Sequence, residues 1–281
     1  MNVLSVDCAA ADAGELFSQS LHETGFAVLR NHPIPEELLH ELMQAWSAFF
    51  ASNEKHTYQA GPQEGDADRW GYISVNQSET AVGHSTKDIK EFYHVFQGHP
   101  VPPRCESATE RYRGLSFELA RRLLGWLQTH TPNSTAAALS EPLAGMLSDQ
   151  SSLLRVLNYP PLDGSEPASA MRAAPHEDIN LLTILPASNQ PGLEVRDTAG
   201  HWHAVPCDAD TLVVNSGDML QEATDGYYPS TTHRVVNPGD GIDNVARISI
   251  PFFLAARPEV VLSERYSAGS YLSERLRLIN R

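Results

Sequence analysis

Two histidines, an aspartate, an arginine and a serine have residue types and spacings that could support metal chemistry. His176 and Asp178 are two residues apart, so on an extended segment both side chains leave the same face. His233 follows much later, which suits a second strand folded back against the first. Two imidazoles and one carboxylate form the facial triad that binds mononuclear iron(II) and leaves positions open for a cosubstrate and oxygen. The pattern therefore predicts an iron(II) site.

Arg247 and Ser249 predict a binding place for a small carboxylate next to this metal. They again share one face of an expected strand. A guanidinium fork together with a hydroxyl suits the end of a dicarboxylate. Taken alone, the metal motif is weak, because the chain has 12 histidines and chance matches are common. An isolated pair of this kind would be interpreted as a hydrogen-bonded histidine at a loop edge, so the surrounding sequence decides.

The surrounding sequence resembles a known family over most of the chain, in the right order. The segments that carry the resemblance are PHEDINLLTIL, GLEVRDTAGHWHAVP, LVVNSGDMLQEATDGYYPSTTHRVVNP and ARISIPFFLAARP. Further upstream, GFAVLRNHPIPEELLHELMQAWSAFF and RWGYISVNQSETAVGHSTKDIKEFYHV resemble the N-terminal and middle regions. The family is the isopenicillin N synthase-like family of iron(II)- and mostly 2-oxoglutarate-dependent oxygenases. The resemblance implies an α+β fold, with a distorted double-stranded β-helix (jelly roll) core flanked by N-terminal and C-terminal helices.

The resemblance also implies roles for single residues. Iron(II) would be held by His176, Asp178 and His233. The cosubstrate 2-oxoglutarate would chelate the iron and extend its far carboxylate to Arg247 and Ser249, leaving one position for molecular oxygen. Tyr159 aligns with a tyrosine that touches the cosubstrate in several members. A strand aromatic with its hydroxyl at the rim explains Tyr159 equally well.

The substrate side is less clear from the sequence. Arg69 and Tyr72, in RWGY, lie where the penicillin-forming relative uses an arginine against a substrate carboxylate. They are therefore candidate substrate residues, and a small, polar metabolite with an anionic group is expected. Leu157 departs from the family pattern, because several plant members have an asparagine there that helps hold 2-oxoglutarate. The spacing between His233 and Arg247 is also wide, and its excess, PGDGIDN, can bulge out as a hairpin.

Composition limits the partners of this chain of 281 residues. The 35 acidic residues outnumber the 20 basic ones, and the net charge of −15 disfavours nucleic acid and anionic lipid as partners. Cys8, Cys105 and Cys207 are odd in number and far apart, so no disulfide framework is expected and a reducing cytoplasm fits. No signal peptide or membrane-spanning stretch is indicated. The oligomeric state is left open.

The expected elements form one domain over residues 1–281, with no hinge between independent parts. Residues 1–150 are helix-rich, with helices at Ala13–Thr24, from Pro35 to Phe50, at Arg111–His130 and around Glu141–Leu147, and with a long loop over 51–90 that could close as a lid. Residues 151–258 form the jelly-roll catalytic core, and 259–281 a C-terminal segment that is helical at Ser270–Asn280. Many short strands separated by Gly/Pro turns are typical of a jelly roll. The expected strands are Leu153–Tyr159, Leu181–Leu185, Gly192–Arg196, Trp202–Val205, Thr211–Val214, Thr231–Val236 and Arg247–Leu254.

Three functions are compatible with these observations. The leading one is an iron(II)- and 2-oxoglutarate-dependent dioxygenase that oxidises an unactivated C–H of a small-molecule metabolite and releases succinate and carbon dioxide. The second is an oxidase or cyclase like isopenicillin N synthase, which uses no 2-oxoglutarate. The third is a non-catalytic jelly-roll binding protein, although all three ligands and the R-x-S motif are present. The sequence does not identify the substrate or choose hydroxylation over desaturation or cyclisation.

Overall fold

Two packed sheets form the centre of the molecule. The computed structural model describes residues 1–60, 70–78, 86–167, 169–206 and 208–279. The large sheet contains nine strands in these residues, and the small sheet contains four. All of these strand pairs are antiparallel except β1 with β2. In spatial order the large sheet comprises β1 (Ser5–Asp7), β2 (Phe26–Arg30), β10 (Leu212–Ser216), β7 (Leu182–Pro186), β13 (Phe252–Leu254), β5 (Leu153–Tyr159), β4 (Glu91–Val95) and β3 (Gly71–Ile73), with β12 (Arg247–Ser249) also paired to β5.

The small sheet faces the large one and completes the jelly roll. Its spatial order is β6 (Ala173–His176), β11 (His233–Val235), β8 (Leu193–Arg196) and β9 (Trp202–Ala204). In the large sheet, β1 to β4 come from the first 150 residues, whereas the other strands lie between Leu153 and Leu254. The helix-rich N-terminal part therefore also supplies edge strands to the catalytic core.

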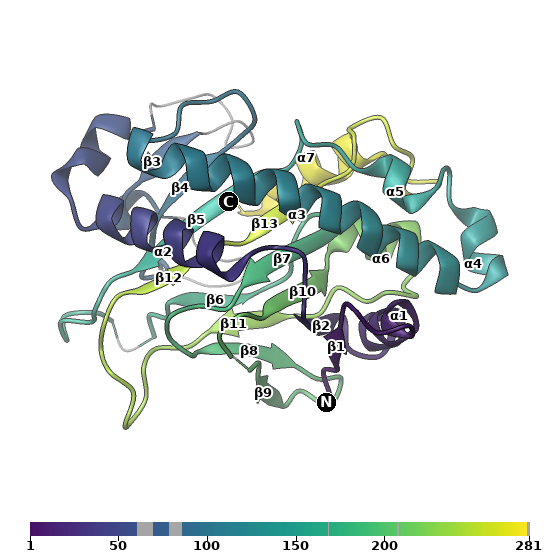
Figure 1. The fold of residues 1–281 in the computed structure, drawn as a ribbon, viewed down its shortest axis with the longest axis horizontal. Helices are drawn as coiled ribbons and strands as arrows, with labels where there is room; N and C mark the ends of the chain where they lie inside the picture. The colour runs from purple at the N-terminus through teal and green to yellow at the C-terminus, as the bar shows by residue number, and fades with distance from the viewer. Residues whose placement is uncertain (61–69, 79–85, 168, 207, 280–281) are drawn as a thin grey trace.

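Helices cover the outer face of the large sheet, where α2 and α3 cross in front of its strands (Figure 1). Their apolar stripes are built by the sequence, since Leu38, Leu42, Trp46 and Phe49 recur at helical spacing and are all buried. The helices are α1 (Ala13–Thr24), α2 (Glu36–Phe50), α3 (Pro103–His130), α4 (Asn133–Ala138), α5 (Leu143–Met146), α6 (Asp218–Ala223) and α7 (Ala268–Ile279), with 3₁₀ turns η1 (Asn53–Tyr58) and η3 (Val75–Gln77). In the described part of the chain, no helix combines the length and apolar character needed to span a bilayer.

Alternation along each strand divides the core into two clusters. On β5, Leu154 and Val156 pack toward the helices, whereas Leu157 and Tyr159 belong to a second cluster between the two sheets. This second cluster is the interior of the jelly roll. Residues at alternate positions of the large sheet therefore face either the helices or the interior where the site lies. Residues of the large sheet that face this interior are called the inner residues.

Several predicted elements have the predicted bounds, and others differ for physical reasons. The helix Ala13–Thr24 and the strand Leu153–Tyr159 are as predicted. The helix predicted from Arg111 begins at Pro103, because a proline is well tolerated in the first turn. The strand predicted over Arg247–Leu254 is two strands, because Pro251 has no N–H to donate to the sheet.

Four short elements were missed, and the long loop is only partly described. Strands β4 and β6 and helices α4 and α6 were not predicted. The loop expected over 51–90 contains η1, β3 and η3 in its described parts, and residues 61–69 and 79–85 lie outside the described residues.

Candidate metal centre and cosubstrate pocket

The three candidate metal ligands lie together at the interior end of the small sheet. His176 is the last residue of β6 and is the direct register partner of His233 on β11. Asp178 lies two residues beyond the end of β6, in the turn before β7, rather than on an extended strand. One potential ligand atom from each residue lies within 4.8 Å of the other two. The antiparallel pairing of β6 with β11 thus joins two ligands that are far apart in the sequence.

Both imidazole rings are oriented by backbone carbonyls on their outer side. Nδ1 of His176 lies 2.8 Å from the Ala174 carbonyl oxygen, and Nδ1 of His233 lies 3.1 Å from that of Thr231. Because a carbonyl oxygen only accepts, each ring donates from Nδ1 and keeps its lone pair on Nε2. The two Nε2 atoms lie 3.9 and 3.7 Å from Oδ1 of Asp178. Three lone-pair donors therefore face one point.

The Asp178 carboxylate is fixed by two neutral donors on the large sheet. Its Oδ2 accepts hydrogen bonds from the Thr183 hydroxyl at 2.6 Å and from the Asn215 amide at 2.8 Å. The Thr183 hydroxyl in turn accepts from the Asn180 amide at 2.9 Å, which orients the hydroxyl toward Asp178. With Oδ2 occupied, Oδ1 is the oxygen directed at the two histidines. Such outer hydrogen bonds orient the ligands of metal sites.

The turn that carries Asp178 is held by a backbone hydrogen bond to the start of α6. The backbone N–H of Asp218 donates to the Asp178 carbonyl at 2.8 Å. At Gly217 a Cβ would lie 2.8 Å from that same carbonyl oxygen and closer still to Asn180, so only glycine fits there. Arg275 of α7 donates to the buried carboxylate of Asp218 at 2.6 Å. The C-terminal helix is thus linked to the turn.

The protonation states of this cluster suit metal binding. Although the His176 side chain is partly exposed, desolvation of its ring by the surrounding protein and then the neighbouring His233 ring lower the pKa of His176, so the ring is neutral at neutral pH. Burial alone would raise the pKa of the Asp178 carboxyl. The two imidazoles and the hydrogen bonds from Asn215 and Thr183 outweigh burial and hold that pKa below its usual value. Neutral imidazoles and an ionised carboxylate are the metal-binding forms.

This set of donors fits iron(II). Metal–ligand bonds of about 2.1 Å place neighbouring ligand atoms roughly 3 Å apart, so shifts of under about 1 Å would bring these atoms onto a metal. The side chains of Asp178 and His233 are 4% and 9% exposed, but that of His176 is 39% exposed. The site is therefore open on one side, as a metal that also binds a cosubstrate and oxygen requires.

The candidate cosubstrate residues lie together in the buried part of the interior. Arg247 on β12 is the register partner of Tyr159 on β5, and its guanidinium lies 5.5 Å from the centre of the tyrosine ring. Ser249 is the next inner residue of β12, and all three side chains are buried. Nε of Arg247 donates to the carbonyls of Gln190 and Pro191 at 3.1 and 3.3 Å, which fixes the plane of the fork. The guanidinium of Arg247 and the hydroxyl of Ser249 are thus both buried and belong to the same face of β12.

Tyr159 and Leu157, two neighbouring inner residues of β5, are both buried in this pocket. Tyr159 is 2% exposed, so its hydroxyl is not at a solvent-exposed rim, and burial raises its pKa despite the nearby Arg247 guanidinium. The phenol is therefore neutral and has a proton to donate. Leu157, the residue that departs from the family pattern, is the register partner of Ser249 and is buried in the inner cluster.

The predicted substrate residues are Arg69 and Tyr72. Arg69 lies outside the described residues. Alternation on β3 turns the Tyr72 side chain toward the helices and leaves Ile73 inside, so the position of Tyr72 gives its predicted substrate role no support. The Tyr72 hydroxyl donates to Glu91 at 2.5 Å, and the ring packs against Phe50, so it has a structural partner on the outer face.

Sequence reasoning did not single out Thr183 and Asn215. The only available signal was the presence of Thr183 in the otherwise apolar LTILP and of Asn215, next to Ser216, in LVVNS. These residues are register partners on β7 and β10, which is why both reach the same carboxylate.

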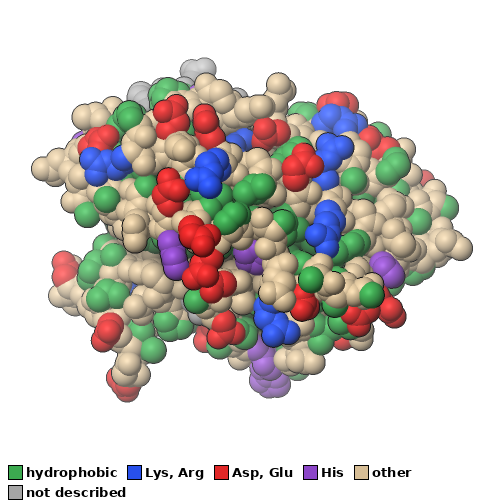
Figure 2. Space-filling view, viewed as in Figure 1, with side chains coloured by type: hydrophobic (Ala, Val, Ile, Leu, Met, Phe, Trp, Pro, Cys, Tyr) green, Lys and Arg blue, Asp and Glu red, His purple; other side chains and the backbone are tan. Residues whose placement is uncertain are grey.

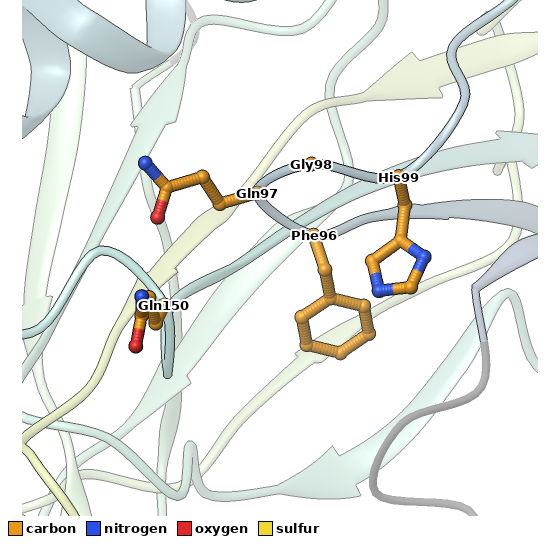
Figure 3. A pocket seen from close by; sticks show the side chains of 5 residues that line it. All are labelled: Phe96, Gln97, Gly98, His99 and Gln150. Atoms are coloured by element: carbon orange, nitrogen blue, oxygen red, sulfur yellow. The ribbon is translucent and has the colours of Figure 1, made fainter.

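A separate hollow lies past the end of β4. It has a volume of about 590 Å³ and is lined by Phe96, Gln97, Gly98, His99 and Gln150. Figure 3 shows the rings of Phe96 and His99 side by side, with the Gln97 side chain directed elsewhere. The candidate metal ligands do not line this hollow.

Comparisons with known proteins agree with this site. Residues 150–256 match the 2OG-Fe(II) oxygenase superfamily, and residues 4–116 match the N-terminal region of the non-haem dioxygenases in morphine synthesis. Validamycin A dioxygenase of Streptomyces hygroscopicus subsp. limoneus is 28% identical, over 90% of this chain and 74% of that protein. Feruloyl CoA ortho-hydroxylase 1 of Arabidopsis thaliana is 30% identical, over 88% of this chain and 67% of that protein.

Solved structures extend the comparison to the whole chain. A protein from Shewanella oneidensis described as an oxygenase is 44% identical, with a TM-score of 0.88 and coverage of 100% of this chain and 99% of that chain. A full-length Neurospora crassa protein in complex with alpha-KG is 20% identical, with a TM-score of 0.79 and coverage of 97% and 95%, and it supports the fold alone.

The fold and the site define a non-haem iron oxygenase on a jelly roll. The chain belongs to the 2OG-Fe(II) oxygenase superfamily, and it is an iron(II)- and 2-oxoglutarate-dependent dioxygenase with molecular oxygen as cosubstrate. Validamycin A dioxygenase and feruloyl CoA ortho-hydroxylase 1 are named as a dioxygenase and a hydroxylase, which supports the 2-oxoglutarate-dependent function over the oxidase and the non-catalytic alternative.

Proposed function

We propose that His176, Asp178 and His233 bind iron(II), and that 2-oxoglutarate binds with its far carboxylate on the fork of Arg247. Ser249 and Tyr159 add a hydroxyl each to this cosubstrate site. The observation that carries the metal assignment is the orientation of the ligands. Each ligand is held from its outer side by a hydrogen bond, so that all three inner lone pairs face one point.

In this proposal the chain's own residues bind, orient and exclude water. Bound iron(II) supplies the activation of oxygen, which is coupled to the oxidation of 2-oxoglutarate to succinate and carbon dioxide. In a hydroxylation, the second oxygen atom enters a C–H bond of the substrate. Thr183 and Asn215 keep the Asp178 carboxylate in its binding orientation, and the buried fork of Arg247 fixes the direction of the cosubstrate.

The proposed substrate is a small metabolite with an anionic group. The named relatives act on small molecules such as validamycin A and feruloyl CoA. Nucleic acid and membrane surfaces are not proposed as partners, because the chain carries a net charge of −15. Figure 2 supports this, since on the face drawn Lys and Arg side chains are scattered among acidic ones rather than gathered in a basic patch.

The cellular setting and the domain organisation are part of the same proposal. The buried thiols of Cys8 and Cys105 are free, which agrees with a reducing cytoplasm. One domain over residues 1–281 is supported by the large sheet, in which strands from 1–150 pair with strands from 151–258.

Anaerobic titration with iron(II) and then 2-oxoglutarate tests the assignment. We expect one iron(II) per chain in the wild-type protein and no binding in His233→Ala. His201→Ala removes an exposed histidine paired with Asp197 and should bind iron(II) normally. Binding of 2-oxoglutarate to the iron protein should produce a metal-to-ligand charge-transfer absorbance. Unchanged metal content in His233→Ala would reject the ligand assignment, and absence of the absorbance in the wild-type protein would favour the oxidase.

A further inference from the structure

A buried ion pair lies directly before β4 and has no part in the iron or cosubstrate assignments. Nζ of Lys90 lies 2.8 Å from Oδ2 of Asp88, and the two residues are only 6% and 4% exposed. The Lys90 backbone N–H donates to the Asp88 carbonyl at 3.0 Å, so a tight turn brings the two residues together. Burial of two charges has a large desolvation cost and adds little net stability on average. The position of the pair in the fold is therefore more informative than its strength.

The segment that carries this pair lies along the strand that carries the metal ligand His176. Among the described residues, β6 is the edge strand of the small sheet. The Ile89 N–H donates to the Met171 carbonyl, just before β6, at 2.8 Å. Within β6, the Ala174 N–H donates to Oδ1 of Asp88 at 3.0 Å. Residues 88–90 therefore connect β4 of the large sheet to the edge of the small sheet.

Ala174 needs this outside acceptor because the pairing of β6 with β11 is irregular there. The register shifts directly after the pair of His176 with His233, so two residues of β6, Ala174 and Pro175, lie opposite one residue of β11. Such a bulge interrupts the ladder of backbone hydrogen bonds. Because Ala174 is 5% exposed, its N–H would be costly to leave without an acceptor. The Asp88 carboxylate provides that acceptor.

The carbonyl of the same residue orients the metal ligand. Nδ1 of His176 donates to the Ala174 carbonyl at 2.8 Å, which leaves the lone pair of Nε2 for a metal. Asp88 thus holds the N–H of Ala174, and His176 is held by its C=O. Orientation of a ligating histidine through the proton on its other ring nitrogen is a general feature of metal sites. A displacement of Ala174 would therefore turn the His176 ring.

We propose that Asp88 is a positioning residue for the metal ligand His176, and that Lys90 holds the Asp88 carboxylate in the required orientation. Oδ2 binds the ammonium, so Oδ1 stays directed at the Ala174 N–H. The Ala174 carbonyl then keeps His176 in the tautomer with its proton on Nδ1. This proposal rests on the proposed function, because it takes His176 as an iron(II) ligand.

Two double variants isolate the hydrogen bond to Ala174. Asp88→Leu/Lys90→Met removes both charges and the acceptor, whereas Asp88→Asn/Lys90→Met removes both charges and keeps an amide oxygen as acceptor. Every other contact of Lys90 is lost equally in both, so it does not affect the comparison. In anaerobic calorimetric titrations, Asp88→Leu/Lys90→Met should bind iron(II) about tenfold weaker than the wild type, the lower limit for outer contacts of metal ligands, because Asp88 acts through the backbone. Asp88→Asn/Lys90→Met should recover most of that affinity.

Heteronuclear NMR of the metal-free, nitrogen-labelled protein gives a second readout that does not depend on iron. The chemical shifts of the two ring nitrogens distinguish the tautomers of a histidine. His176 should carry its proton on Nδ1 in the wild type and in Asp88→Asn/Lys90→Met, and should be a mixture of both tautomers in Asp88→Leu/Lys90→Met. The Ala174 amide proton of the wild type should exchange slowly with solvent, because Asp88 accepts it. Rapid exchange of this proton would overturn the proposal without any variant having to fold.

Arg113→Met/Asp149→Leu is the matched control for the loss of an ion pair. Arg113 on α3 pairs with Asp149 at 2.6 Å and stacks on the helix-facing Phe252 ring. This variant should have a lower Tm but the iron(II) affinity and the His176 tautomer of the wild type. An equal loss of iron(II) affinity in this control would overturn the proposal, since general destabilisation would then explain both results.

The outcomes separate this proposal from the proposed function. A wild-type protein that binds no iron(II) would reject the ligand assignment itself. Normal iron(II) binding in the wild type, with equal affinities and equal tautomers in the two folded Asp88 variants, would reject the role of Asp88 alone.

Discussion

Replacing Thr183 by valine isolates the hydrogen bond that orients the metal-binding carboxylate. Valine has nearly the same shape as threonine but carries no hydroxyl. The change removes the 2.6 Å hydrogen bond to Oδ2 of Asp178 and leaves the Asn215 amide at 2.8 Å as the remaining donor to this oxygen. Both Thr183 and Asp178 are buried, so water does not readily replace the missing donor. We expect weaker iron(II) binding in a folded protein.

The expected loss of iron(II) affinity in Thr183→Val can be worked out in two ways. A hydrogen bond to a charged group contributes about 1.5–3 kcal/mol. Loss of an outer hydrogen bond to a metal ligand typically weakens metal binding by about 10- to 100-fold, which is about 1.4–2.7 kcal/mol. Because Asn215 still holds Oδ2, the lower half of this range is expected, or about 10- to 30-fold.

Anaerobic calorimetric titration with iron(II) measures this effect. Thr211→Val is the control, since Thr211 is a buried threonine whose hydroxyl donates to the Asp208 carbonyl rather than to a metal ligand. The control variant should bind iron(II) as the wild type does. Equal iron(II) affinity in Thr183→Val and wild type, with both proteins folded, would refute the idea that this hydroxyl positions Asp178.

Three further changes test other contacts of the site. Arg247→Lys keeps the charge but loses the fork, so 2-oxoglutarate should bind about tenfold weaker in anaerobic titrations with iron binding intact, and unchanged affinity would contradict the assignment. Gly217→Ala forces a Cβ against the Asp178 carbonyl, so purified protein should contain less iron by metal analysis; full occupancy would show that the turn adapts. Arg275→Met removes the ion-pair partner of the buried Asp218 carboxylate, which should lower the free energy of unfolding by about 2 kcal/mol and the Tm by about 4–8 °C in calorimetry. An unchanged Tm would mean that the ion pair contributes no net stability.

The sequence predicted the metal cluster because its signal is local and chemical. His176, Asp178 and His233 are recognisable by type and spacing, and their neighbours resemble one family along most of the chain. Their meeting depends only on the pairing of β6 with β11, which that resemblance implies. Strand β5 was likewise predictable, because LLRVLNY is a short, mostly apolar run that is followed by two prolines.

The supporting residues could not be predicted, because they depend on register between strands. Thr183 reaches Asp178 together with Asn215 only because β7 and β10 pair at these two positions. A shift of one residue would turn both side chains toward the helices. The orientation of Tyr72 could not be predicted for the same reason, since alternation on β3 turns Tyr72 toward the helices and Ile73 toward the interior. The few residues of a short strand determine neither its register with a neighbouring strand nor which of its two faces turns toward the interior.

The large sheet separates stability from chemistry by its two faces. The helix-facing residues of β5, β7 and β10 are mainly apolar and join one continuous core with α2 and α3. The inner residues include polar side chains, namely Thr183, Asn215, Arg155, Arg247 and Ser249. Because burial of apolar area on the helix side contributes most of the stability, isosteric changes of inner polar residues should mainly alter ligand binding. The Thr183→Val variant should therefore lose iron(II) affinity with a fall in Tm of only a few degrees, whereas truncation of the helix-facing Val156 or Ile184 should lower the Tm more and leave iron(II) affinity unchanged.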